Sequence, residues 1–315
     1  MIYPGAMPAR YLVIVNPASR NGATGRRWRQ VEAKLRDALG SLEVEQTRGP
    51  RDAERIAREA VRAGVERLVV AGGDGTTSEV VSGLLAADLA SYAQVGVLPL
   101  GTGGDLARVL ELPRDLGAAI EGLARGNTRR IDAGRITFLG NDGKQQTQFF
   151  LNVASFGISG LVAQLVNRAP KALGGTLSFL IGTLRGIARY RPQDVMVRID
   201  GRVVHRGPVV LAAAANGRYF GGGMQIAPDA RPDDAQLDLV LVEGVGKLAL
   251  LSRFPPIYRG RHLADPAVSV HRGVLIEADA APGEVRLEVD GEPLGSLPAT
   301  IELLPGALTL FGMPA

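Results

Sequence analysis

VAGGDGTTSE, residues 70–79, joins the end of an apolar strand to the start of a predicted helix. The strand is Arg67–Ala71 and the helical pattern covers Thr77–Ala87. Glycines let the backbone turn sharply and approach a ligand closely, and the helix N-terminus that follows favours an anion. No lysine follows the glycines, so this is not a Walker A loop, and the spacing is not G-x-G-x-x-G. The segment predicts a phosphate-binding turn, with a plain strand–helix turn as the simpler alternative.

The same alternation of strand and helix extends outward over residues 10–137. Short apolar runs predict three more strands, and helical spacing with terminal glycines predicts helices between them. The strands are Tyr11–Val15, Leu42–Gln46 and Val95–Leu100, and the helices Arg26–Leu39 and Asp52–Gly64. Strands separated by helices of this length imply a parallel sheet whose ligands bind at the carboxyl ends of its strands.

A second glycine-rich loop, LPLGTGGDLAR at residues 98–108, follows the next predicted strand. Two such loops at the ends of adjacent parallel strands describe a nucleotide site, and their acids Asp74 and Asp105 are candidate Mg²⁺ ligands. Asn16 follows the first strand and falls on the same sheet edge. A helix N-cap role for Asp105 and a simple Asn-Pro turn at Asn16 stay open as alternatives.

Beyond residue 137 the predicted pattern changes from alternating strands and helices to short strands with few helices. Strands are expected at Phe149–Val153, Val195–Ile199, Val203–His205, Val209–Ala215, Leu237–Val242, Val268–Ala278 and Val285–Val289, and helices at about Gly160–Asn167, Thr176–Arg189 and Lys247–Arg253. We therefore expect an α/β domain over residues 1–137, with completion by residues 300–315 left open. A mainly antiparallel, β-sandwich-type domain is expected over residues 138–299.

Composition excludes several classes of function. The chain of 315 residues has no cysteine and three scattered histidines, which excludes disulfides and thiolate chemistry and argues against imidazole metal sites. A net charge of +4 and few aromatic residues, without a basic–aromatic motif, rank a nucleic-acid binder last. No apolar run is long enough to span a bilayer and no signal peptide is indicated, so we expect a cytoplasmic protein.

Four segments together resemble the diacylglycerol-kinase catalytic family, in its bacterial soluble lipid kinase branch. They are GGDGTTSEVV, LPLGTGGDLAR, the stretch Asn216–Leu239, and EVDGEPL at Glu288–Leu294. They occur in the family's order and cover nearly the whole chain. GGDGT alone is not specific, because NAD kinases and phosphofructokinases carry similar loops on a related domain. The resemblance implies that same phosphofructokinase/NAD-kinase-like fold for the first domain.

The resemblance also implies an ATP- and Mg²⁺-dependent kinase that phosphorylates a hydroxyl of a diacylglycerol-like lipid. Family nucleotide contacts fall on Asn16, Thr47, Gly72, Gly73, Asp74, Gly75, Thr76, Thr77, Ser78, Glu79, Gly101 and Thr102. The family's proton acceptor falls on Glu292, and we expect Asp74 and Asp105 to organise catalytic Mg²⁺ and the phosphates. A structural Mg²⁺ falls on the Asp234 side chain and the carbonyls of Arg231 and Gln236. Without the family, a polar turn and an exposed hairpin acid would be the simpler interpretations of these last two segments.

Other questions stay open at this stage. Gly104 stands where the family has asparagine, which leaves any role tied to that amide in doubt. An NAD kinase and a catalytically inactive nucleotide-binding regulatory protein are the alternative functions.

Basic residues near 185–206 suggest peripheral contact with the inner face of the membrane, with Thr176–Arg189 as an interfacial helix. A core-packed helix with a solvated basic edge is the alternative. The acceptor lipid, a homodimer and regulation by phospholipid are not decided.

Overall fold

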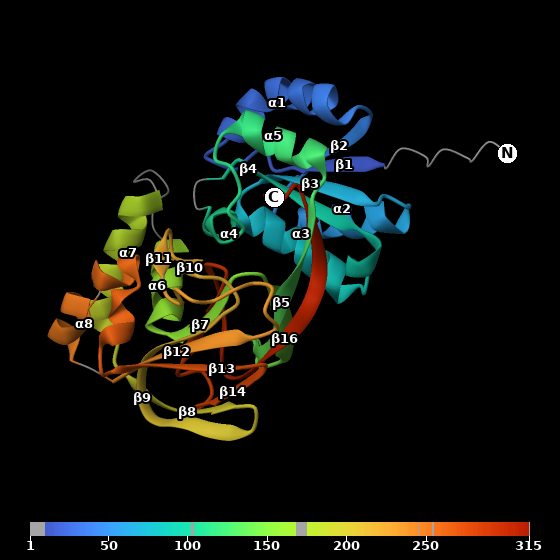
Figure 1. The fold of residues 1–315 in the computed structure, drawn as a ribbon. Coiled ribbons are helices and arrows are strands. Elements are labelled where there is room, and N and C mark those ends of the chain that lie inside the picture. Colours follow the sequence, from blue (N-terminus) through green and yellow to red (C-terminus); the bar gives the residue numbers. More distant parts are fainter. Residues whose placement is uncertain (1–9, 102–103, 168–174, 245, 254, 315) are drawn as a thin grey trace. The chain divides into compact units, whose positions relative to one another are not determined.

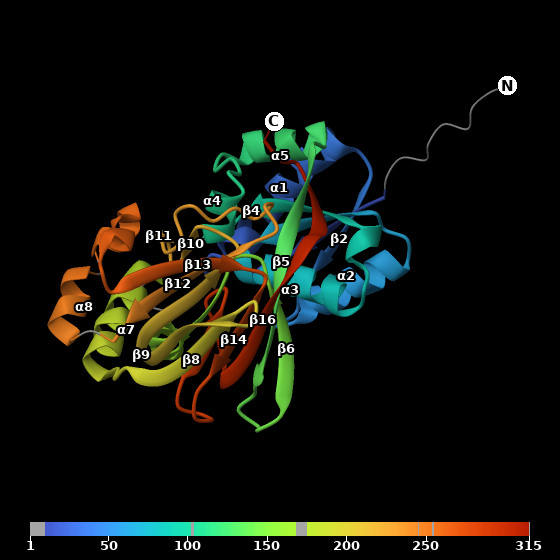
Figure 2. The same cartoon turned by 60° about the horizontal axis from the view of Figure 1, so that its bottom comes forward.

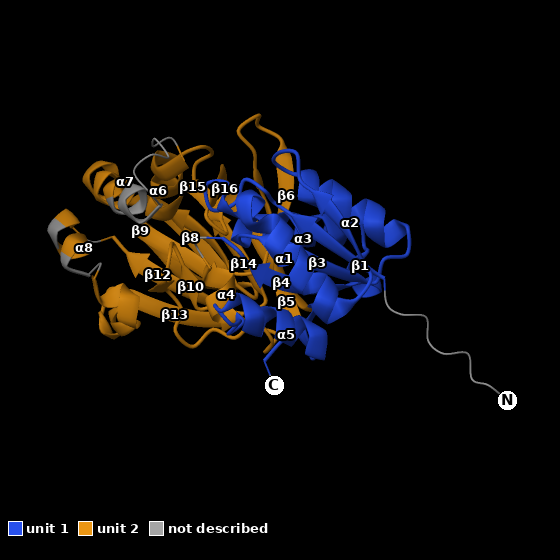
Figure 3. Cartoon of the chain, turned by 90° about the horizontal axis from the view of Figure 1, so that it is seen from above, with its two compact units in different colours: residues 1–102, 110–130, 307–315 blue, residues 103–109, 131–306 orange. Residues whose placement is uncertain are grey.

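The computed structural model describes residues 10–101, 104–167, 175–244, 246–253 and 255–314. The chain divides into two compact units (Figure 3). Unit 1 consists of residues 1–102, 110–130 and 307–315, and unit 2 of residues 103–109 and 131–306. In the described part of the chain, no helix is long and apolar enough to cross a membrane.

Unit 1 is built on a parallel sheet. Its strands lie in the order β16-β4-β3-β1-β2 and comprise β1 (Tyr11–Val15), β2 (Leu42–Gln46), β3 (Arg67–Gly72), β4 (Gln94–Pro99) and the last residues of β16 (Glu292–Phe311). The apolar runs are continuous because helices cover both faces of the sheet, so that Val13, Ile14 and Val15 are all fully buried. The predicted parallel α/β sheet is confirmed.

Two pairs of helices cover the sheet of unit 1 (Figures 1 and 2). α1 (Ala23–Leu39) and α5 (Leu116–Arg125) share one apolar cluster with Val13 and Val15. α2 (Asp52–Arg62) and α3 (Asp74–Ala86) pack on each other so closely that a Cβ on Gly83 would lie 2.6 Å from the Glu54 carbonyl oxygen. A short 3₁₀ turn, η1 (Ala90–Tyr92), precedes β4.

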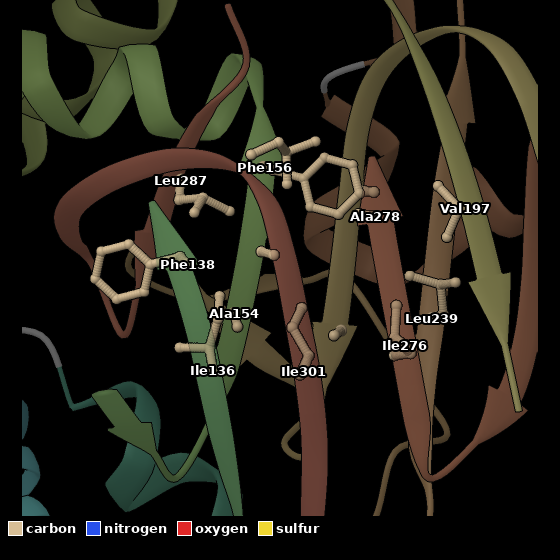
Figure 4. Close-up of a cluster of buried hydrophobic side chains, with 14 of the residues drawn as sticks. Ile136, Phe138, Ala154, Phe156, Val197, Leu239, Ile276, Ala278, Leu287 and Ile301 are labelled. Carbon is tan, nitrogen blue, oxygen red and sulfur yellow. The ribbon is translucent and has the colours of Figure 1, made fainter. Parts of the chain in front are cut away.

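Unit 2 is mainly antiparallel. Besides β16, its strands are β5 (Thr128–Leu139), β6 (Gln145–Phe150), β7 (Val153–Gly157), β8 (Gln193–Ile199), β9 (Arg202–Ala215), β10 (Tyr219–Phe220), β11 (Met224–Gln225), β12 (Leu237–Glu243), β13 (Val268–Gly273), β14 (Leu275–Asp279) and β15 (Arg286–Val289); the first residues of β5 belong to unit 1. Its helices are α4 (Asp105–Val109), α6 (Ile158–Asn167), α7 (Gly175–Arg189) and α8 (Lys247–Arg253). Two 3₁₀ turns are η3 (Pro255–Arg259) and η4 (Arg261–Ala264). Pairing runs β9-β7-β15-β16-β14-β8 and returns to β9, so these strands close into a ring. Alternate residues, among them Phe156, Leu287 and Ile301, point into one buried cluster (Figure 4).

The structure corrects three predicted boundaries. Val203–His205 and Val209–Ala215 are parts of one strand, β9, whose hairpin with β8 has φ of 49° at Asp200 and 79° at Gly201. Val268–Ala278 is two strands, β13 and β14, that separate at Val274. α3 begins at Asp74 rather than Thr77, so the glycine loop runs directly into its first turn.

Candidate active site

The two glycine loops of unit 1 touch each other through their backbones. β3 and β4 pair in parallel up to Gly72 and Pro99. A Cβ on Gly101 would lie only 2.5 Å from the α-carbon of Gly73, and the Leu100 N–H donates to the Gly72 carbonyl at 2.9 Å. A Cβ on Gly72 would lie 2.7 Å from Thr76 Oγ1. Glycine is therefore needed on both loops for this close approach, at the sheet edge that the sequence predicted.

Asn16 connects the first strand to the first turn of α3. Its Nδ2 donates to Thr76 Oγ1 at 3.0 Å, its Oδ1 accepts the Ala18 N–H, and its own N–H donates to Ala71. Thr76 and Thr77 are buried, and both the N–H and the hydroxyl of Thr77 donate to the Gly73 carbonyl. These polar side chains thus shape the loop, and the backbone at the N-terminus of α3 is what it offers to an anion.

The remaining predicted nucleotide contacts have varied surroundings. Thr47 follows β2, and its N–H donates to the Val15 carbonyl at 2.8 Å, which places it at the same edge as Asn16. Asp74 and Ser78 lie in the first turns of α3 and are half-buried. The Glu79 carboxylate accepts the Ala53 N–H at 3.3 Å and so fastens the N-terminus of α2. The exposed Gly75 has open space around it, whereas Thr102 lies outside the described residues.

A methyl group on Gly101 is expected to force the two loops apart. The clash of Gly101→Ala is with the backbone of Gly73, which cannot rotate away as a flexible side chain could. Overpacking of this kind costs about 1–3 kcal/mol, so the midpoint of urea unfolding should fall. Gly75→Ala, with no atom within 4 Å of its Cβ, is the matched control; its midpoint should not fall, because alanine is favoured over glycine in a helix. Equal midpoints for both variants would contradict the close contact.

In unit 2, the Asp290-Gly291 turn between β15 and β16 presents Glu292. Both turn residues are left-handed, with φ of 47° and 89°, as a two-residue hairpin requires. The Asp290 carboxylate accepts three backbone N–H groups, those of Leu151 (3.1 Å), Asn152 (3.1 Å) and Val153 (3.0 Å). This positioning role of Asp290 was not predicted, because it depends on residues nearly 140 positions away in the chain.

Glu292 is exposed, as a proton acceptor for an incoming hydroxyl must be. Its Oε2 accepts a hydrogen bond from Asn167 Nδ2, at the end of α6, at 3.2 Å. The backbone of α6 lies directly on β15, since a Cβ on Gly160 would be 2.6 Å from the Arg286 carbonyl. The helix and the locked turn together define where the Glu292 carboxylate lies.

Glu288 lies buried two residues before the turn and was not predicted. Its Oε1 accepts the Ser155 hydroxyl at 3.0 Å, and a hydrogen bond of 2.8 Å joins the Ser155 and Ser159 hydroxyls. Burial raises the pKa of Glu288 to about 8; the Ser155 hydrogen bond opposes the shift, and the charges of Asp290, Glu292 and Asp105 add to it. Four carboxyl groups of unit 2 therefore share one electrostatic neighbourhood.

Asp105 opens α4 and is nearly buried. One carboxylate oxygen pairs with Arg108 Nη1 at 2.6 Å, and the other accepts the Gly222 N–H at 2.7 Å. The first bond lies within α4 and the second ties α4 to the loop between β10 and β11; the catalytic role of Asp105 stays a prediction. Gly104 has a φ of +67°, and a Cβ added there would have no atom within 4 Å. Asparagine tolerates this backbone region better than most residues, which explains how glycine replaces it without distortion.

The segment predicted to hold a structural Mg²⁺ is a turn that Asp132 fastens through the Ala235 N–H at 2.9 Å. The Asp234 carboxylate pairs with Arg272 and accepts the Gln236 N–H at 3.2 Å. The pKa of Asp238, which shares Arg272, is raised chiefly by burial.

Arg272 thus supplies the positive charge that a cation would bring to this turn. Among the described residues, no group of three or more His, Asp or Glu side chains could hold a metal. A cation here would rely on the carbonyls of Arg231 and Gln236 and would compete with Arg272 for Asp234. A site of one carboxylate and two carbonyls does not require such a group, so the metal assignment at this turn stays a prediction, and no chemical step is assigned to it.

Comparison with known proteins places these features in a family. The model of the diacylglycerol kinase catalytic domain matches residues 10–136, and that of the YegS C-terminal NAD kinase beta sandwich-like domain matches residues 152–312. A diacylglycerol kinase of Mycobacterium tuberculosis is 32% identical over 300 residues, 95% of this chain and 93% of its own length. The crystal structure of a Bacillus anthracis diacylglycerol kinase is similar with a TM-score of 0.72 and 23% identity, covering 96% of each chain.

The chain therefore belongs to the diacylglycerol kinase family, as its motifs predicted. Membership confirms the expectation of a lipid kinase at the level of the family, whose phosphate donor is ATP. Yeast NADH kinase, in complex with NADH, shares the fold with a TM-score of 0.54 over 96% of this chain and 83% of that one, at only 14% identity. That likeness confirms the predicted NAD-kinase-like fold and leaves the NAD kinase function with less support.

Proposed function

We propose that this chain transfers the γ-phosphate of ATP to a hydroxyl group of diacylglycerol or a closely related lipid. The observation that carries the proposal is the Asp290-Gly291-Glu292 turn. Three backbone N–H groups fix Asp290, and Glu292 remains exposed to accept a proton. The acceptor named by the Mycobacterium tuberculosis relative supports diacylglycerol as the first lipid to test.

In this proposal unit 1 binds the donor. The N-terminus of α3 and the glycine backbone around Gly73 bind phosphate oxygens through N–H groups, and Asn16 maintains the shape of the loop through Thr76. Mg²⁺, held by Asp74 together with the phosphates, would supply neutralisation of the charge on the transferred group. Catalysis of phosphoryl transfer consists mainly of such positioning and charge stabilisation.

In unit 2, Glu292 accepts the proton of the lipid hydroxyl as its oxygen bonds to the γ-phosphorus and the bond from that phosphorus to the bridging oxygen breaks, releasing ADP. Asn167 orients the Glu292 carboxylate by donating a hydrogen bond to Oε2, and Asp290 holds the turn. The nearby Glu288, whose pKa is raised by burial, is protonated near neutral pH and adds little negative charge to the site.

The substrate would be reached at a membrane surface. Leu184 is exposed on α7 and is followed by Arg185, while Ile187 is buried against the protein. This mixture of an exposed leucine and arginines supports peripheral contact with the anionic inner face of the membrane. We extend the proposal to a cytoplasmic enzyme that binds this surface transiently; a homodimer stays a prediction.

The test is transfer of radiolabelled γ-phosphate from ATP–Mg²⁺ to a panel of acceptors. Diacylglycerol, phosphatidylglycerol, monoacylglycerol, sphingosine and ceramide are presented in anionic and in neutral vesicles, with NAD in parallel and Asp74→Ala as the blank. We expect label in one glycerolipid, more of it from anionic vesicles, and none in the blank. Label in NAD alone, or ATP binding without any transfer, would contradict the proposal.

A further inference from the structure

Unit 1 also contains a cavity of about 530 Å³ between α1 and α5, to which the proposed kinase reaction assigns no role. Its floor is apolar and includes Val31, Leu98 and Leu116. Its volume lies in the range of about 300–1,000 Å³ that small-molecule pockets occupy. The loop Gly72–Glu79 contributes no lining residue to it, whereas Leu98, Pro99 and Leu100, the first residues of the second glycine loop, do.

Four arginines line the cavity: Arg20, Arg26, Arg27 and Arg114. The one acidic lining residue is Asp115, and its Oδ1 already accepts the Ala118 N–H at 2.9 Å as the N-cap of α5. A cavity with this lining carries a marked excess of positive charge. We call these four residues and the cavity they surround the arginine pocket.

The arginines of this pocket differ from others in the same unit. Arg36, Arg55 and Arg58 each form an ion pair with a carboxylate at 2.5–2.9 Å. Within the described residues, the four arginines of the pocket have no such ion pair; Arg26 donates to the Asn21 carbonyl instead. Like charges gathered without a counter-charge repel one another, and an anionic ligand would remove that cost.

The backbone adds to the positive potential. α1 begins at Ala23 and α5 at Leu116, and both first turns line the cavity, so the positive ends of two helix dipoles meet there. Arg20 is held with φ of 52°, followed by Asn21 with φ of 53°. Arginine rarely adopts this region, whereas asparagine tolerates it, and the turn positions Arg20 at the pocket.

We propose that the arginine pocket binds a small ligand that carries a phosphate or pyrophosphate group, at a site that borders the second glycine loop but takes no residue from the loop Gly72–Glu79. Guanidinium groups bind phosphate oxygens in a bidentate manner, which lysine cannot do, and the apolar floor would contact a nonpolar part of the ligand. The pocket lies on the α1 and α5 face of the sheet, whereas α3 belongs to the other face. The proposal goes beyond the kinase function and does not depend on it.

Calorimetric titration of the full chain at low salt tests this site. The probes are inorganic pyrophosphate and soluble dihexanoyl phosphatidic acid, each with and without a saturating non-hydrolysable ATP analogue. We expect a probe to bind in the presence of the analogue. The double variant Arg27→Ala/Arg114→Ala should weaken its affinity at least tenfold while leaving that of the analogue unchanged. Arg29→Ala, an exposed arginine on α1 outside the pocket, should bind the probe as the wild type does.

The relative affinities identify the source of the phosphate. Tighter binding of pyrophosphate supports a soluble ligand, and tighter binding of the short-chain lipid supports a lipid headgroup. The proposal is wrong if neither probe binds, if the double variant binds as the wild type does while keeping its unfolding midpoint, or if the analogue displaces the probe. Failure of the analogue itself to bind would count against the kinase function and leave the pocket to be judged by the titrations without it.

Discussion

Replacing Glu292 by glutamine is expected to reduce turnover at least ~10²-fold while leaving the affinity for ATP nearly unchanged. The amide keeps the shape of the carboxylate and can still accept the hydrogen bond from Asn167, but it cannot take a proton from the lipid hydroxyl. Because the turn is held by Asp290 and not by Glu292, the fold should be unaffected. The measurements are the steady-state rate of lipid phosphorylation and calorimetric binding of ATP.

Glu284→Gln provides the control for this experiment, because Glu284 is an exposed acid in the same unit, outside the Asp290–Glu292 turn. It should retain wild-type turnover. If Glu292→Gln turns over at a near-normal rate, Glu292 is not the proton acceptor. If it loses ATP affinity to the same extent as turnover, the residue acts in binding and the assignment also fails.

Glu288→Gln is expected to stabilise the protein by a few kcal/mol at pH 8, with a much smaller gain near pH 5. The pKa of Glu288 is raised from 4.5 to about 8 by burial, and each unit of such a shift is worth about 1.4 kcal/mol. Below pH 4.5 the group is protonated in both the folded and the unfolded chain. As the pH rises from there to about 8, the unfolded chain releases the proton while the folded chain holds it, so the wild type loses stability.

Urea unfolding of the wild type and Glu288→Gln from pH 5 to pH 9 measures this difference. The gap between their free energies of unfolding should widen up to about pH 8 and then stay constant. Glu284→Gln should show no comparable trend. A gap independent of pH, or a variant less stable than the wild type at pH 8, would show that Glu288 is ionised in the folded protein at neutral pH.

The parallel sheet and the two glycine loops were predictable because they are local patterns. Apolar runs such as Tyr11–Val15 mark buried strands, and the glycines mark the turns between strand and helix. The start of α3 was not predictable in the same way, because the helical pattern becomes visible only from Thr77, three residues after the helix begins. The structure shows that Gly73 occupies the N-cap position.

The roles of individual acids depend on partners that are distant in the chain. The sequence around Asp290 is typical of an ordinary hairpin turn. Its hydrogen bonds to the N–H groups of residues 151–153 form only when the chain folds. Likewise Arg272, 38 positions from Asp234, neutralises a carboxylate that the resemblance assigned to a metal. Spacing within one segment carries no information on such contacts. The roles of Asp290 and Asp234 therefore became visible only in the three-dimensional structure.

The central claim is that a lipid hydroxyl, and not a nucleotide, accepts the phosphate. The most direct measurement offers diacylglycerol vesicles and NAD together to the wild-type chain with γ-labelled ATP–Mg²⁺, and then separates the organic from the aqueous phase. We predict label in the organic phase, reduced at least ~10²-fold by Glu292→Gln. Label confined to NADP in the aqueous phase would contradict the assignment.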